Sequence, residues 1–461
     1  MPSAAPPRLV RVDEVAAGAS SAGRPAEVLR VPAFALFWSA TTIRAFGSAA
    51  AGVAFQVLIV TVINATPIQI SVLSALGVVP YLFLGLIVGA LMDRWRRQRT
   101  LVLTSIGRAL ALAAIPVMLL TNTLSFWTLA IVVLILGVLT LFADSAAQPL
   151  LPLLVPRRSL VVANARLGQS ATVAATAGPA AGGALLNLIG APLLFALESV
   201  ILAVSALLQS RIKVSEAGAP ARVPGRHIGH DITEGFHYTY RHRTLRPLAL
   251  SVHTWFLAHS IVTTLFGVFV LRELDVPEWA FGLILAFGGV GGFVGAMLAP
   301  RTGARRGAGR AILLGRGLTV APWLALALLP VTPTTSLVVL VVVLSAVQFI
   351  YALSQGIEDA NEMGYRQAAA PDAMQGRMNS TIRTANRVVF FIGALVSGAI
   401  ATALGYRFAI GLAAVIFAGA ALIIAFSPVR RARHEDDHSI AGLSEEGFPP
   451  AQTAPTASPE V

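Results

Sequence analysis

Residues 126–148 read FWTLAIVVLILGVLTLFADSAAQ, a run in which Asp144 is the first charged residue. An α-helix needs about 20 apolar residues to cross the hydrocarbon core of a bilayer, so this run predicts a membrane-spanning helix. Similar runs recur along the 461-residue chain, in which 56% of the residues are apolar, 12% are charged and the mean hydropathy is +0.75. A soluble domain has about 45–50% apolar and about 25% charged residues. Most of the chain is therefore expected to have lipid as its solvent.

Twelve such runs can be counted, and they predict an all-α membrane protein. Helices are expected because backbone groups in lipid must be satisfied within the segment, and barrel strands show alternation instead of continuous apolar runs. The predicted transmembrane helices are residues 34–62, 68–92, 100–120, 126–148, 162–188, 193–212, 247–271, 279–300, 311–329, 337–363, 380–404 and 408–428.

The arginines predict the orientation of these helices, because short cytoplasmic loops carry an excess of Arg and Lys. The loops at 93–99 and 301–310 hold four arginines each, whereas the loops on the opposite side hold only Arg272 and Arg407. Residues 1–30 lack the apolar segment of a signal peptide. Both termini are therefore expected in the cytosol, which in a bacterium places this multi-pass protein in the inner membrane.

A long polar break at residues 213–246 separates six runs from six. The spacing of its four histidines matches no known zinc site, so we interpret it as a solvated linker with room for a short surface helix. The chain has no cysteine, which excludes disulfides and thiolate metal sites. The expected parts are a cytosolic N-terminal tail (1–31), a six-helix bundle (32–212), the cytosolic linker (213–246), a second six-helix bundle (247–428) and a disordered cytosolic C-terminal tail (429–461).

The two sets of six runs contain an internal repeat. Gly107-Arg108 recurs as Gly315-Arg316 at an offset of 208 residues, and several positions recur at an offset of 215. Repeated bundles are the architecture of secondary transporters, in which the substrate site lies near the midplane between the repeats. We therefore expect two pseudo-symmetric bundles. The pairs at an offset of 215 are Asp144 with Asp359, Pro156 with Pro371, Asn164 with Asn379, Gly178 with Gly393, Gly183 with Gly398 and Gly190 with Gly405.

Several motifs in these bundles resemble those of the major facilitator superfamily over about residues 32–428. Residues 89–97 (GALMDRWRR) are similar to the superfamily signature in the loop between the second and third helices. Residues 178–183 (GPAAGG) resemble its antiporter motif. Residues 153–158 (LLVPRR) and 376–378 (GRM) look like the branch that contains macrolide efflux proteins and the enterobactin exporter.

The sequence also departs from the superfamily pattern. The fourth span lacks the usual arginine followed by Gln-Gly, and the second copy of the loop signature has Ala299-Pro300 in place of Asp93-Arg94. The proton pathway of the superfamily is therefore not transferred residue by residue.

The loop signature implies a gate on the cytosolic side. Asp93 follows a helix C-terminus, where the macrodipole disfavours an anion, so it needs a cationic partner. The resemblance implies that this partner comes from the eleventh span and links the two halves; alternatively, the arginines only anchor the loop. The gate candidates are Asp93, Arg94, Arg97, Arg383 and Arg387.

The glycines of the antiporter motif imply a close helix contact that can open. Gly178, Gly182 and Gly183 leave a stripe without side chains, and Pro179 removes a backbone donor and favours a bend. The alternative interpretation is ordinary packing of small residues.

Ionisable residues within spans are informative, because each costs about 2.5–3.5 kcal/mol at the bilayer centre on insertion scales. Arg44 is the deepest, and we expect it to line a cavity and contact an anionic or carbonyl-bearing substrate; the alternative is a structural ion pair. Arg108 and Arg316 are expected to pair with acidic neighbours. His253 is either a cavity residue or a helix-packing histidine. The cavity candidates are Arg44, Ser48, Gln56, Gln169, His253, Gln348 and Gln355.

An antiporter needs a carboxyl group that can exchange a proton. Apolar surroundings favour the protonated carboxyl and a neighbouring arginine favours the ionised form, so rocking of the bundles could trade a proton. Asp144 and Glu358 are the preferred candidates, with Glu198 and Asp359 as further ones; structural salt bridges are the alternative.

These features predict a secondary transporter, and the resemblance implies a proton-coupled antiporter that exports a hydrophobic or amphipathic small molecule, such as a drug, macrolide or siderophore-like compound. The alternatives are an importer or proton symporter, or a non-transporting receptor with a filled bundle. No ATPase, nucleophile or metal motif is present, so neither an enzyme, a cofactor nor a metal is expected. The expected partners are the substrate, protons and the lipid bilayer, with no nucleic acid, and the protein is expected to be a monomer.

Overall fold

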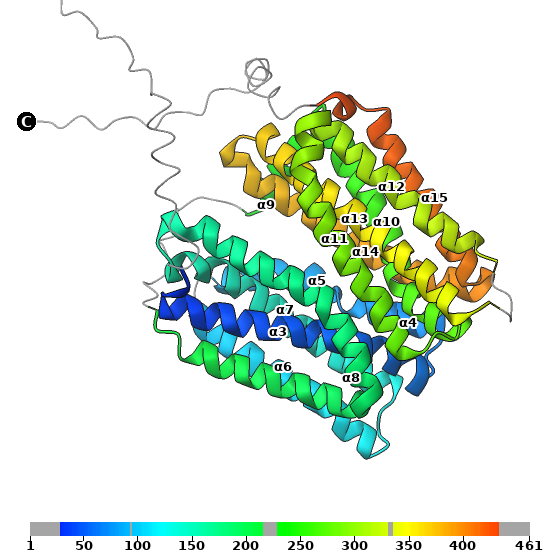
Figure 1. The fold of residues 1–461 in the computed structure, drawn as a ribbon. Coiled ribbons are helices and arrows are strands. Elements are labelled where there is room, and N and C mark those ends of the chain that lie inside the picture. Colours follow the sequence, from blue (N-terminus) through cyan, green and yellow to red (C-terminus); the bar gives the residue numbers. More distant parts are fainter. Residues whose placement is uncertain (1–27, 93–94, 215–227, 331–334, 433–461) are drawn as a thin grey trace, which may run out of the picture.

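The computed structural model describes residues 28–92, 95–214, 228–330 and 335–432. Within these ranges the chain is helical and has no strand (Figure 1). The α-helices are α3 (Pro32–Val57), α4 (Pro67–Leu76), α5 (Val79–Met92), α6 (Arg97–Leu120), α7 (Phe126–Leu154), α8 (Leu160–Ser210), α9 (Ile228–Arg241), α10 (Leu245–Val268), α11 (Glu278–Arg306), α12 (Ala308–Leu328), α13 (Leu337–Ala369), α14 (Asp372–Leu404) and α15 (Tyr406–Ala425).

The described residues contain eleven helices that are long and apolar enough to cross a membrane, and one of them, α8, is two helices. At Gly190 the backbone of α8 leaves the helical region with φ 75°, which glycine adopts without steric cost. Ala163 and Ile212, near the two ends of α8, lie in one core cluster, so its halves run antiparallel. Gly405 has φ 86° and separates α14 from α15 in the same way. The chain therefore makes the twelve predicted crossings, which confirms the fold class.

The first helix of each half ends in a π-helical turn. Residues 58–62 continue α3 and residues 269–273 continue α10. The second span is interrupted where α4 ends at Leu76 and α5 begins at Val79. Helix starts are fixed locally: Thr66 and Ser125 each form a capping box at the start of α4 and α7, which satisfies free backbone donors of the first turn.

The helices pack as two bundles (Figure 1). In the N-terminal bundle α8 packs on α3 and α6, and α7 packs on α5 and α6. In the C-terminal bundle α13 packs on α11 and α12, and α10 packs on α14 and α15. The bundles meet mainly where α8 contacts α11 and where α4 contacts α14.

The apolar core shows which end of the molecule is closed. We call the end at which α6 begins and α11 ends the basic end, and the end at which Gly190 lies the far end. One core cluster is continuous across both bundles towards the far end, where Ile59, Leu194, Phe269 and Phe281 belong to it. Towards the basic end the clusters belong to one bundle or the other. The bundles are therefore fused at the far end and separate at the basic end.

Arg272 forms hydrogen bonds between the two bundles at the far end. Its guanidinium donates to the backbone carbonyls of Val60 and Ala65, each at 2.9 Å. Val60 lies in the last turn of the first span, where carbonyls lack intrahelical partners and carry partial negative charge, so its carbonyl suits a cation. Arg407 instead donates to the Leu329 carbonyl and pairs with Glu273, both within the C-terminal bundle. Arg272 thus links the two bundles at the far end, and Arg407 stabilises the far end of the C-terminal bundle.

The described part of the predicted linker is helix α9, which packs on α14 and α10. The Tyr240 hydroxyl lies 2.7 Å from His253 Nε2, and the Tyr238 hydroxyl donates to the Ala369 carbonyl at 3.2 Å. Arg377 pairs with Glu234. This part of the linker is therefore held on the C-terminal bundle by polar contacts.

The start of the predicted C-terminal tail also packs on the fold. Residues 428–431 form a 3₁₀ turn against α12, and the Gly309 amide donates to the Ala432 carbonyl at 3.0 Å. The rest of that tail, residues 1–27 and residues 215–227 lie outside the described part of the chain.

Candidate functional site

The N-terminal bundle encloses a cavity of about 610 Å³ between α3, α6, α7 and α8. Arg44, Arg108 and Asp144 line it together with Asn164 and Gln209. Arg44 therefore lies at a cavity wall, as expected from its position in the first span. Ser48 and Glu198 are not among the lining residues of this cavity; the Ser48 hydroxyl donates to Glu198 Oε1 at 3.0 Å, between α3 and the second half of α8.

Asp144 is connected to the opposite bundle through Tyr81. The Tyr81 hydroxyl of α5 donates to Asp144 Oδ2 at 2.9 Å. The Arg387 guanidinium of α14 lies 3.9 Å from the centre of the Tyr81 ring, which is a cation–π contact. A candidate for proton exchange and a candidate for the gate are thereby joined, through a tyrosine that the apolar pattern of the second span does not single out.

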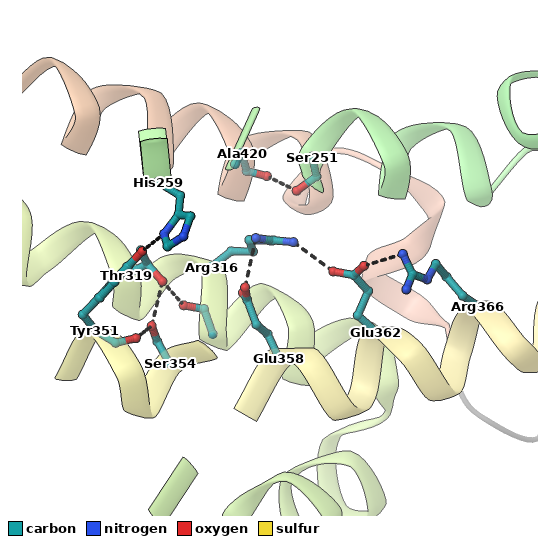
Figure 2. A network of polar contacts seen from close by, with 11 residues as sticks. Ser251, His259, Arg316, Thr319, Tyr351, Ser354, Glu358, Glu362, Arg366 and Ala420 are labelled. Atoms are coloured by element: carbon teal, nitrogen blue, oxygen red, sulfur yellow. Dashed lines mark hydrogen bonds and ion pairs between the residues drawn. The ribbon is translucent and has the colours of Figure 1, made fainter. Parts of the chain in front are cut away.

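The C-terminal bundle encloses a second cavity, of about 420 Å³, built around Arg316 of α12. Arg316 pairs with Glu358 and Glu362 of α13, each at 2.9 Å, and Glu362 also pairs with Arg366 at 3.3 Å (Figure 2). Glu358 and Arg316 are 1% and 2% exposed. The expectation that Arg316 pairs with an acidic neighbour is confirmed, and Glu358 is a partner in that buried pair.

An aromatic wall adjoins this ion-pair cluster. His259 Nδ1 lies 2.5 Å from the Tyr351 hydroxyl (Figure 2). The His259 ring also stacks on Trp255. The Arg316 guanidinium lies 5.4 Å from the centre of the Trp255 ring. Arg316 therefore combines two carboxylates with an aromatic face.

His253 bridges α9 and α14. Its Nδ1 atom lies 2.6 Å from Asn386 Oδ1, so with this orientation of the amide Nδ1 carries the proton and Nε2 accepts from Tyr240. Asn386 lines the C-terminal cavity, whereas His253 is not among its lining residues. The contacts with Tyr240 and Asn386 thus favour the interpretation of His253 as a helix-packing residue.

The glycines of the antiporter motif face two different neighbours. A Cβ atom at Gly182 would lie 2.7 Å from Ala50 Cα, and Gly178 faces Ala49, so both pack on α3 within the N-terminal bundle. A Cβ atom at Gly183 would lie 3.0 Å from Gly282 Cα of α11. Gly183 therefore belongs to the contact between the bundles, and the other two glycines hold the N-terminal bundle together.

The remaining polar candidates are dispersed. Gln56 lies against Gly267 of α10, so it faces the other bundle at the far end. Gln169 is exposed on α8, and Gln348 packs beside Gly288. Gln355 lines the C-terminal cavity.

The gate candidates are described in part. Asp93 and Arg94 lie outside the described residues. Arg97 donates to the Pro149 carbonyl within the N-terminal bundle, at 3.1 Å. Arg383 is exposed and lines the C-terminal cavity together with Asp359. A pairing of Asp93 with Arg383 or Arg387 stays a prediction.

The chain matches known membrane proteins over most of its length. A family model described as transmembrane secretion effector matches residues 24–450. The multidrug efflux pump Tap of Mycolicibacterium fortuitum is 25% identical over 352 residues, which are 74% of this chain and 83% of the relative.

Solved transporters have similar folds. An inward-facing, unoccupied bacterial homologue of the human lysosomal transporter Spinster has a TM-score of 0.63 and 15% identity, covering 85% of this chain and 95% of that one. An inward-facing bacterial homologue of the iron transporter ferroportin has a TM-score of 0.64 and 17% identity, covering 86% and 98%. The nucleoside transporter NupG has a TM-score of 0.66 and 11% identity, covering 84% and 98%. At these identities the likeness concerns the fold.

Proposed function

The chain belongs to the transmembrane secretion effector family of the major facilitator superfamily, and we propose that it exports a hydrophobic or amphipathic small molecule by alternating access. The observation that carries the proposal is the pair of charged cavities, one in each bundle, beside an interface whose described apolar core is continuous across the bundles at the far end. Such cavities favour transport over a non-transporting receptor, for which a filled bundle is expected.

Export is favoured by the likeness to Tap, which is named an efflux pump. The arginine-rich loops favour a cytosolic basic end, with both termini in the cytosol. In that orientation the described state is inward-facing and takes up its substrate from the cytosol or the inner leaflet. The protein then acts as a monomer in the bilayer, because each chain holds both halves of the transport path.

Proton antiport through Asp144 forms the second part of the proposal. Asp144 is exposed at the N-terminal cavity and accepts a hydrogen bond from Tyr81, whose ring contacts Arg387 of the other bundle. Rocking of the bundles would part Arg387 from Tyr81 and so change the surroundings of the Asp144 carboxylate, which is the coupling that antiport needs. Glu358 is committed to a buried pair with Arg316, so it is the weaker candidate for proton exchange.

Transport in proteoliposomes tests this proposal. With an imposed proton gradient, uptake of a hydrophobic fluorescent dye and of a panel of amphipathic compounds is expected in inverted vesicles. Asp144→Asn is expected to lower gradient-driven transport at least tenfold, in line with the loss of a general acid–base group. Exchange of the compound across the membrane without a gradient should persist, since it needs no net proton transfer.

Asp275→Asn is the matched control, because Asp275 is exposed in a far-end turn with φ 49°, which asparagine also adopts. An equal loss in both variants would contradict the role of Asp144. If the unmodified protein transports compounds at the same rate with and without the proton gradient, proton antiport is contradicted. Movement in the opposite direction would favour an importer or symporter.

A further inference from the structure

Two arginines of the N-terminal cavity lack a hydrogen-bond or ion-pair partner among the described residues. Arg108 is 9% exposed, and its Nε atom is buried without a hydrogen bond. Neither Arg44 nor Arg108 makes a hydrogen bond or an ion pair with any residue in the described part of the chain, although both line the cavity. A buried guanidinium that lacks a partner costs free energy, so buried charges in proteins are normally paired.

The acidic residues nearby are held elsewhere. Tyr81 donates to Asp144 at 2.9 Å, and Ser48 donates to Glu198 at 3.0 Å. Arg108 is repelled by Arg44 and attracted by Glu198 and Asp144, which act on it electrostatically without forming an ion pair. Within the described residues, neither carboxylate makes a hydrogen bond or an ion pair with Arg44 or Arg108.

The internal repeat indicates which group is missing. Arg316, the repeat mate of Arg108, pairs with Glu358 and Glu362. Subtracting the offset of 215 from these two positions gives residues 143 and 147, which are Ala143 and Ala147. Both alanines line the N-terminal cavity. The carboxylates that fill the C-terminal bundle are thus replaced by methyl groups, and the N-terminal cavity is the larger one, at about 610 Å³ against about 420 Å³.

The two cavities also differ in the balance of charged residues that line them. The acidic and basic residues of the C-terminal cavity balance, three against three: Arg316, Arg366 and Arg383 with Glu358, Asp359 and Glu362. In the N-terminal cavity Arg44 and Arg108 face a single lining carboxylate, Asp144. The residues that line the N-terminal cavity therefore carry one cation more than anions, while Glu198 acts on both arginines from outside the lining.

We propose that Arg44 and Arg108 bind a carboxylate of the transported molecule, in the place that a glutamate side chain takes in the repeat-related cavity. This inference rests on the proposed function and names its substrate class as amphipathic carboxylates. Guanidinium groups bind carboxylates through paired, charge-assisted hydrogen bonds. Phe37, Leu101 and Leu167 of the cavity wall offer apolar surface to the rest of such a molecule.

The proposal is tested by binding, without any ion gradient, in phosphatidylcholine nanodiscs that contain no anionic lipid. The probes are dansyl-phenylalanine and its carboxamide, which differ only in the carboxylate and report binding by fluorescence. A hydrogen bond to a charged group is worth enough to make the acid bind about ten- to a hundredfold more tightly than the amide. Arg44→Gln and Arg108→Gln are each expected to bring this ratio close to one.

Arg211→Gln is the control, because it removes the same charge from an exposed position at the basic end, outside the cavity lining. It should leave the ratio of acid to amide affinity unchanged. A loss in Arg211→Gln as large as in Arg44→Gln would overturn the proposal, and so would equal affinity of the two probes for the unmodified protein.

Ala143→Glu provides an independent test that adds a partner instead of removing one. The new side chain supplies the carboxylate found at the repeat-related position, so it should abolish the preference for the acid and preserve binding of the amide. Ala143→Gln has the same size without the charge and should keep the preference. A preference that survives Ala143→Glu would contradict the proposal.

The outcomes separate this inference from the proposed function. Arginine-dependent binding of the acid, with no gradient-driven movement of any compound, would leave the carboxylate site standing and remove proton-coupled export. Export of compounds with no difference between acid and amide binding would do the reverse.

Discussion

Replacing Arg316 by alanine is expected to lower the free energy of unfolding by about 3–5 kcal/mol, because removing one member of a buried ion pair leaves uncompensated charge behind. Glu358 and Glu362 would both lose their 2.9 Å partner, and Glu358 is 1% exposed. The measurement is unfolding by denaturant or heat in detergent, followed by tryptophan fluorescence, since Trp255 and Trp323 lie in the same bundle.

Two further variants test whether uncompensated buried charge causes the loss of stability. Adding Glu358→Gln and Glu362→Gln to Arg316→Ala should restore part of the stability, because the remaining buried charge is removed. Arg383→Ala, an exposed cation of the same cavity, should change stability by no more than about 0.5 kcal/mol. Equal destabilisation by Arg316→Ala and Arg383→Ala would contradict the buried cluster.

Replacing Gly282 by leucine is expected to reduce transport at least tenfold while the protein stays folded. A Cβ atom at Gly282 would lie 2.8 Å from Gly183 Cα of the other bundle, so the larger side chain acts against the closed far end. Overpacking costs about 1–3 kcal/mol, which shifts a two-state population roughly five- to 150-fold. Because the contact lies between the bundles and not inside either one, we expect the larger loss in the transport rate and the smaller in thermal stability.

Gly317→Leu and Gly182→Leu are the two controls for Gly282→Leu. Gly317 is exposed on α12 with no atom within 4 Å of its Cβ position, so its replacement should change neither transport nor stability. Gly182 faces Ala50 inside the N-terminal bundle, so its replacement should lower stability. Normal transport by Gly282→Leu would show that the glycine contact between α8 and α11 is not part of the transport cycle.

The fold could be predicted from the sequence because lipid leaves few solutions for long apolar runs. The internal repeat in the sequence predicted two related bundles. Its matched glycines Gly190 and Gly405 both have positive φ, and each lies at the turn between two helices. The docking of α9 could not be predicted, because polar linker sequences look alike whether they are solvated or held by contacts such as that of Tyr240 with His253.

The site could be predicted only in part, because a stripe on one helix meets different neighbours at different depths. Arg44, Ser48 and Gln56 share one face of α3, yet only Arg44 lines the cavity. Ser48 bonds Glu198, and Gln56 lies against α10. Tyr81 could not be predicted, because an aromatic residue in an apolar run has no distinguishing pattern and its contact with Arg387 depends on the packing of the two bundles.

In the proposed transport cycle, the two bundles alternate between opening at the basic end and opening at the far end. The chain has no cysteine, so spin labels can be attached selectively to cysteines introduced at exposed positions of both ends. Arg157 and Arg305 provide a pair across the basic end, and Leu120 and Leu328 a pair across the far end.

Pulsed electron paramagnetic resonance on these two pairs, with and without Arg272→Ala, is the most direct measurement. Arg272→Ala removes two charge-assisted hydrogen bonds between the bundles, so the fraction of molecules open at the far end should rise at least tenfold. The far-end distance should lengthen in the same fraction of molecules in which the basic-end distance shortens. Arg407→Ala, whose partners lie within one bundle, should change neither distance. A single unchanging distance at each end, or lengthening at both ends together, would contradict the account.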